Sequence, residues 1–176
     1  MAVEVVKSAG ITNLDAVPPL ANTQGEGAKF SLECVDDWAT VPASASAAST
    51  FRLVRIPTTC KVKQVLFESE AQAAGATDIG LYYSSSVNDS PAALAKAGAV
   101  IDADFFASAV ALTSASGPTD VTNEGGFYTL NERSLPIWKA VGLSADPGGF
   151  FDVVATLSTA VTTGTGKIGC RVSYSK

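Results

Sequence analysis

The sequence predicts an all-β fold, a single antiparallel sandwich or barrel of about eight strands. Short runs rich in β-branched and aromatic residues recur along the chain, and clusters of Gly, Pro, Ser, Thr and Asn separate them. Several runs alternate between apolar and polar residues, which is the period of a strand with one buried face. A chain of 176 residues is also long enough to bury the core of one domain without disulfides or metals.

The first part of the chain, residues 1–28, is predicted to be an extended arm that precedes a single sandwich domain over residues 29–176. Residues 8–26 contain several glycines, prolines and asparagines with little periodicity, which is typical of irregular structure. Pro18 and Pro19 favour extended backbone over helix in this segment.

The first half of the domain contains four expected strands, at residues 30–35, 51–56, 61–68 and 78–83. The stretch 41–50 is rich in Ala and Ser and is expected to be a loop. In the fourth strand Ile79, Leu81 and Tyr83 share one face at period two.

The middle of the chain has a mixed pattern. Residues 91–97 are expected to form a short helix with Ser90 as its N-cap. Residues 100–112 are expected to be a short strand that runs into a short helix, because Asp102 or Asp104 could cap one or two helical turns.

The last third of the chain returns to a strand pattern. Residues 114–123 are expected to be loop and residues 126–131 a strand. Residues 150–158 are the strongest strand candidate, and in residues 167–174 apolar or aromatic side chains alternate with polar ones. The turn-rich run 162–166 lies between these two strands and therefore predicts a hairpin.

Composition excludes several classes of function. The net charge is −5, and the 12 Lys and Arg residues are scattered singly, whereas a nucleic-acid-binding protein needs clustered cations. No stretch approaches the roughly 18 consecutive apolar residues of a membrane span. Residues 1–7 have neither the basic start nor the apolar segment of a signal peptide. We therefore expect no nucleic-acid partner, no membrane partner and no export by that route.

Histidine and cysteine content bears on catalysis and on the redox compartment. The chain has no histidine, so the commonest general base and metal ligand is missing. We expect no enzyme activity, no catalytic residue, no metal and no cofactor. Cys34, Cys60 and Cys170 are far apart and odd in number, unlike a disulfide framework. We expect buried free thiols and synthesis in a reducing cytoplasm.

Two pairs of carboxylates are candidates for a metal site or a catalytic acid/base pair. Asp102 and Asp104 could chelate a hard cation, but capping and loop hydrogen bonds explain them better because two Phe residues follow at once. Glu68 and Glu70 share one face of a predicted strand and could form an acid/base pair of the glycosidase kind. Carboxylates on the exposed face of a sheet are common, however, so we expect a solvated pair.

The chain is unusually apolar for a protein that stays alone in water. Charged residues make up 16% of it and the mean hydropathy is +0.24, compared with about 25% charged residues in a typical domain. Part of this apolar surface is expected to be covered by other subunits. An extended arm can pair with a sheet edge, and a tryptophan can anchor an interface. The partner-binding candidates are Leu14, Val17, Pro18, Pro19, Leu20 and Trp38.

Several stretches of the chain resemble small virion proteins of tailed bacteriophages. The resemblance lies in residues 11–19, in residues 100–110, and in residues 140–147 leading into 151–157; residues 78–82 also fit. It implies a capsid decoration, or cement, protein with a jelly-roll-like sandwich that binds the outside of the mature head. The partners implied are the major capsid protein and further copies of the chain, as a dimer or trimer. No catalytic residue is carried over.

The sequence leaves three other classes of function open. A tail or baseplate component would also be β-rich and oligomeric. A carbohydrate-binding module of the virion could use Tyr82, Tyr83, Phe127 and Tyr128 as stacking surfaces. A hydrolase would have to rely on the paired carboxylates.

Overall fold

The structure is a computed structural model that describes residues 31–84 and 95–176. Residues Leu32–Lys176 form one compact unit, which holds all of the described strands. The arm predicted at residues 1–28 lies outside the described residues, as does most of the helix predicted at residues 91–97.

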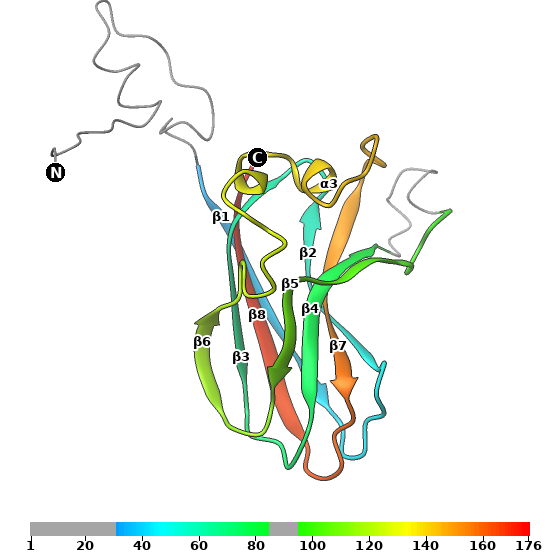
Figure 1. The fold of residues 1–176 in the computed structure, drawn as a ribbon, viewed down its shortest axis with the longest axis vertical. Helices are drawn as coiled ribbons and strands as arrows, with labels where there is room; N and C mark the ends of the chain where they lie inside the picture. The colour runs from blue at the N-terminus through cyan, green and yellow to red at the C-terminus, as the bar shows by residue number, and fades with distance from the viewer. Residues whose placement is uncertain (1–30, 85–94) are drawn as a thin grey trace, which may run out of the picture. The chain divides into compact units, whose positions relative to one another are not determined.

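The described residues form eight strands in two four-stranded sheets, in which every pair of neighbours is antiparallel (Figure 1). The first sheet has the order β1 (Glu33–Val41), β8 (Gly166–Ser175), β3 (Lys61–Ser69), β6 (Ser116–Asp120). The second sheet has the order β2 (Thr50–Pro57), β7 (Phe150–Thr159), β4 (Ala76–Tyr83), β5 (Val100–Ala111).

The pairing of the strands follows a simple rule. The first strand pairs with the eighth, the second with the seventh, the third with the sixth and the fourth with the fifth. This is the arrangement produced when one long antiparallel hairpin rolls up into two packed sheets, which is a jelly roll. The predicted jelly-roll-like sandwich of about eight strands is therefore confirmed.

The core lies between the two sheets and follows the alternation of the strands. In β8 the side chains of Ile168, Cys170, Val172 and Tyr174 belong to the core, as the sequence pattern predicts. The predicted apolar face of β4, which ends at Tyr83, also belongs to it. In each of these two strands, the residues that alternate with the core residues therefore point to the outer face of the sandwich.

The first strand extends further than the sequence prediction placed it. β1 ends at Val41 rather than at residue 35, because Val35, Ala39 and Val41 continue the period-two pattern of inward side chains. Trp38 consequently lies in a strand, at a position that points outward.

The strand-then-helix prediction for residues 100–112 is wrong, since this segment is the long strand β5. Ala107 of β5 is opposite Ile79 and Asp102 is opposite Leu81, so five steps along β5 correspond to two along β4. The additional residues form a large bulge in which the adjacent Phe105 and Phe106 are both buried. Consecutive buried residues imitate the pattern of a helix, which explains the error.

The bulge of β5 lies over Gly80, in the middle of β4. A Cβ atom added to Gly80 would lie 2.1 Å from the backbone oxygen of Asp102 and 2.3 Å from the carbonyl carbon of Ala103. A glycine inside a strand often marks such a close approach of another backbone. The chain therefore covers part of the outer face of its own second sheet.

The interpretation of residues 114–131 is also wrong. Residues 116–120, expected to be loop, form the edge strand β6, which exists through its pairing with β3 rather than through strand propensity. Residues 126–131, expected to be a strand, lie in the connection that leads to the short helices η1 (Glu132–Ser134) and α3 (Ile137–Ala140). Tyr128 anchors this connection in the core, and its hydroxyl donates to the Val62 carbonyl at 2.8 Å.

The hairpin predicted between the last two strands does not form. β7 and β8 belong to different sheets, so the turn around Gly164 joins the two layers of the sandwich. In a jelly roll, a short turn between two strong strands can cross between sheets instead of closing a hairpin.

Candidate functional site

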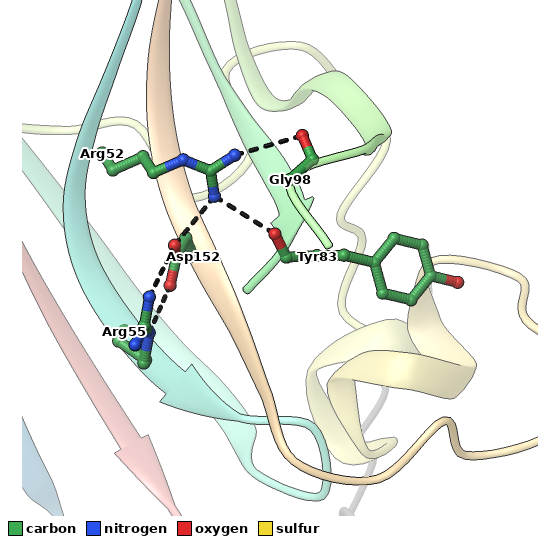
Figure 2. Close-up of polar contacts among 5 residues, drawn as sticks. All are labelled: Arg52, Arg55, Tyr83, Gly98 and Asp152. Atoms are coloured by element: carbon green, nitrogen blue, oxygen red, sulfur yellow. Dashed lines mark hydrogen bonds and ion pairs between the residues drawn. The ribbon is translucent and has the colours of Figure 1, made fainter. Parts of the chain in front are cut away.

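The outer face of the second sheet carries a buried carboxylate. Asp152 lies in β7 between two core residues and points outward, yet it is only 2% exposed. Arg55 binds it with two contacts, Nε to Oδ1 at 2.6 Å and Nη2 to Oδ2 at 3.0 Å. Arg52 adds a third, Nη1 to Oδ2 at 2.8 Å (Figure 2). Two guanidinium groups thus compensate the desolvation of one carboxylate.

Arg52 extends this cluster to the neighbouring strand. Its guanidinium also donates to the carbonyl oxygens of Tyr83 and Gly98, each at 3.1 Å (Figure 2). It lies 5.6 Å from the centre of the Tyr82 ring as well. The cluster therefore fastens β2 to β7 and β4 and holds the backbone just before β5. Its hydrogen bonds are used within the fold, which is typical of a structural cluster.

The outer face of the first sheet carries a cavity of about 340 Å³. Its lining comes from β1, β3, β6, β8 and the residue that follows β3. It consists of Trp38, Glu68, Ser69, Glu70, Ser116, Lys167, Ile168 and Gly169. Trp38 is 57% exposed, although burial of such a large apolar ring is favourable. This cavity, called the Trp38 cavity below, is the candidate binding site.

The register of three strands builds the Trp38 cavity. Gly169 of β8 is paired with Trp38 of β1 on one side and with Glu68 of β3 on the other. These residues form one row across the outer face, and the middle position has no side chain. A Cβ atom added to Gly169 would lie 3.1 Å from Oε1 of Glu68, so the carboxylate leans over the glycine. The row therefore leaves a slot between the indole ring and the carboxylate.

The charged side chains around the slot differ in how they are held. The Lys167 ammonium lies 4.1 Å from the centre of the Trp38 ring, a cation–π contact. A carboxylate oxygen of Glu70 accepts a hydrogen bond of 2.8 Å from the backbone N–H of Lys167. For the Glu68 carboxylate, no hydrogen bond or ion pair is found with the residues that the structure describes. Its charge therefore faces the slot and solvent.

The predicted partner-binding residues divide into two groups. Trp38 is exposed on a sheet face, where it is accessible to a partner. Leu14, Val17, Pro18, Pro19 and Leu20 lie outside the described residues. The sequence alone could not predict that Trp38 and Glu68 line the same cavity. The strands that carry them are neighbours of the last strand of the chain, one on each side of it, and this order is known only from the structure.

The aromatic residues suggested as stacking surfaces do not form one. Tyr83 and Tyr128 belong to the core. Tyr82 is 8% exposed, and its hydroxyl is 2.8 Å from Oγ1 of Thr156. Of the four, only Phe127 is well exposed.

The pair Asp102 and Asp104 lies in the bulge of β5 rather than at a helix cap. The backbone N–H of Asp104 donates to Oδ1 of Asp102 at 3.3 Å. Burial, together with the neighbouring Asp104, raises the pKa of Asp102. Within residues 31–84 and 95–176, no three His, Cys, Asp or Glu side chains gather as a metal site would require. Among these residues there is also no helix with the length and hydrophobicity needed to cross a bilayer.

The three cysteines are free thiols in two environments. Cys60 and Cys170 are buried as expected, and burial raises the pKa of each thiol to about 12. The expectation of burial is wrong for Cys34, which is exposed. It lies in β1, on the outward face that also carries Trp38.

Comparison with known proteins identifies the fold. No known protein family and no curated protein matches the sequence. A chain in the structure of the capsid asymmetric unit of cyanophage Pam1 is similar, with a TM-score of 0.50 and 15% identity. The match covers 92% of this chain and 96% of that chain. The two chains therefore share their fold over nearly their whole lengths.

Proposed function

We propose that this chain is a structural protein of a bacteriophage virion and that it decorates the outer surface of the head. The observation that carries the proposal is the fold shared end to end with a chain of a cyanophage capsid. The resemblance of several sequence stretches to small virion proteins of tailed phages supports the same conclusion. The role is one of binding rather than catalysis.

A decoration protein stabilises a capsid through mass action. A ligand that binds the assembled lattice, but not the separated subunits, shifts the equilibrium toward assembly. The sandwich forms a dimer or trimer, and an oligomer that contacts several lattice sites at once gains from a high effective concentration at each of them. Modest contacts per copy then suffice to hold neighbouring capsid subunits together.

Two parts of the chain make the contacts. The Trp38 cavity offers an exposed indole at the face of a rigid sheet, and such rings are frequent anchors of protein interfaces. The proline-containing first part of the predicted arm, residues 1–22, reaches the major capsid protein or a neighbouring copy and adds a strand to an exposed sheet edge. The outer face of the second sheet is less suited, because the bulge over Gly80 covers part of it.

A co-sedimentation experiment tests the proposal. Heads and tails of the phage, both prepared without this protein, are incubated separately with the purified chain and pelleted. We expect saturable binding to heads, weaker binding by Trp38→Ala, and unchanged binding by Phe127→Ala, which removes another exposed aromatic ring. A variant lacking residues 1–22 should fold and lose occupancy. Binding to tails alone, or to neither particle, would overturn the proposal.

A further inference from the structure

We infer that the Trp38 cavity binds an arginine side chain, presented by the protein surface on which this chain docks. The inference rests on the proposed function, because it names the chemistry by which the decorated surface is recognised. Three features of the cavity favour arginine: the indole ring, the carboxylate opposite the ring, and the balance of charge.

The indole ring already attracts a cation. Lys167 places its ammonium 4.1 Å from the centre of the Trp38 ring, although two carboxylates line the same cavity. Tryptophan is the aromatic side chain with the strongest affinity for cations. More than half of Trp38 is still exposed, so a second cation, this one planar, has ring surface to stack on.

The carboxylate of Glu68 lies across the slot from the ring. Neighbouring strands are about 4.8 Å apart, so the backbones that carry Trp38 and Glu68 are roughly 10 Å apart, with Gly169 as the floor between them. The Glu68 side chain itself lies over Gly169, so the space that remains lies between its carboxylate and the indole ring, and a flat group can stack on the ring there and reach the carboxylate. A guanidinium is such a group, because it is planar and its paired N–H donors match both oxygens of a carboxylate.

The charge of the lining selects a cation. Glu68 and Glu70 contribute two negative charges and Lys167 one positive charge, which leaves an excess of one negative charge in the cavity. Glu70 is held by the backbone of Lys167, whereas Glu68 has no ion-pair partner within the described residues. A bound arginine would neutralise the excess. At about 340 Å³ the cavity also has room for the guanidinium and part of its aliphatic stem.

Titration of the purified full-length chain with a small arginine derivative tests the inference. The probe is N-acetyl-arginine methylamide, and its control is the neutral citrulline analogue of nearly the same shape. The readout is the NMR signal of the Trp38 indole N–H, assigned with Trp38→Phe, while the signal of Trp138, which packs against the core, is the internal reference. We expect a saturable shift with the arginine derivative and a response about fivefold weaker, or less, with citrulline.

Variants distinguish binding in the slot from a general effect of the protein's charge. Glu68→Gln and Gly169→Ala should each weaken the arginine response about fivefold, the first by removing the charge and the second because the added methyl group presses on the Glu68 side chain and displaces its carboxylate. Glu124→Gln removes a carboxylate outside the cavity lining and should leave the response unchanged. Circular dichroism verifies that each variant is folded.

Three results would overturn the inference: no saturable shift, an equal response to citrulline, or a saturable response to glucose, galactose or mannose in place of arginine. The last would identify a carbohydrate site. The titration uses no phage particles, so its failure is distinguishable from failure of the proposed function. If heads bind the chain but the arginine derivative does not, the decoration role stands and the arginine inference fails.

Discussion

At the scale of single residues, Asp152 shows how this sandwich keeps a charge on a covered face. The carboxylate is 3% exposed as a side chain, while Arg52 and Arg55 remain 33% and 41% exposed. The carboxylate thus depends on the two arginines for its solvation, and both arginines retain contact with water. Removal of the anion would leave two guanidinium groups side by side without compensation.

We therefore predict that Asp152→Asn destabilises the fold by about 3 kcal/mol, the lower part of the range for breaking a buried ion pair, because both partners are partly hydrated. Urea unfolding followed by tryptophan fluorescence measures the loss. Asp146→Asn, which changes an exposed aspartate, is the control and should stay within about 0.5 kcal/mol of the unmodified chain. A loss for Asp152→Asn no larger than that of the control would contradict the account.

The cysteines give a second prediction at this scale. The nucleophile is the thiolate, so the pKa near 12 of Cys60 and Cys170, together with their burial, protects them from thiol reagents. Ellman's reagent should modify only Cys34 of the three in the native chain and all three in urea. Cys34→Ser should abolish the native reaction. Rapid modification of two or three native thiols would show that the core is open.

At the scale of elements, the bulge of β5 depends on a single glycine in β4. Gly80→Ala would place a methyl group against the backbone at Asp102, which cannot move without distorting the strand pairing. We expect a destabilisation of about 3 kcal/mol or more. Gly117→Ala in β6 is the matched control, because a Cβ atom there has no heavy atom within 4 Å. Equal stability of the two variants in urea would contradict the close approach.

Carboxylates stabilise both edge strands of the first sheet through hydrogen bonds. The stability of the fold is therefore expected to decrease in acid. Lys176 and Tyr174 hydrogen-bond to Glu33 of β1 and lower its pKa. Burial alone would raise the pKa of Asp120 in β6, but hydrogen bonds from Thr122 and Gln64 outweigh it and lower the pKa. A carboxyl with a lowered pKa in the folded chain stabilises the fold above its ordinary pKa, and this stabilisation is lost as the pH falls through the folded value.

The free energy of unfolding should therefore decrease as the pH falls below about 4.5, the ordinary pKa of Glu33, and through 3.8, that of Asp120. Asp102 opposes this trend, since its pKa is raised, but Glu132 reinforces it through a pKa lowered chiefly by its hydrogen bond from Thr129. Urea midpoints at pH 7 and pH 3 measure the change. A midpoint that is equal or higher at pH 3 would contradict the prediction.

The elements also show what the sequence could predict. β3, β4, β7 and β8 were predicted nearly to their ends. In β3, β4 and β8 apolar side chains recur at period two, and β7 is a run rich in β-branched and aromatic residues. β5 and β6 were not predicted correctly. The bulge of β5 breaks the alternation, and β6 consists of residues with little preference for strands, so both depend on pairing with distant partners.

At the scale of the whole molecule, the topology of the sheets determines where the candidate binding site lies, and this topology could not be predicted from the sequence. The rolled-up pairing of first strand with last brings β1 and β3 to either side of β8, and only then does Trp38 lie across from Glu68. Trp38 was predicted as a partner-binding residue from its type alone, whereas the cavity beside it depends on the register. The same topology sends β7 and β8 to different sheets, which is why the predicted hairpin failed.

We propose that this chain holds the neighbours in a capsid lattice together. The most direct measurement is the temperature at which DNA-filled heads, prepared without the chain, release their DNA, detected with an intercalating dye before and after the purified chain is added back. The account predicts release at a higher temperature once the chain is bound, with a smaller increase for Trp38→Ala. Release at the same temperature with and without saturating chain would contradict it.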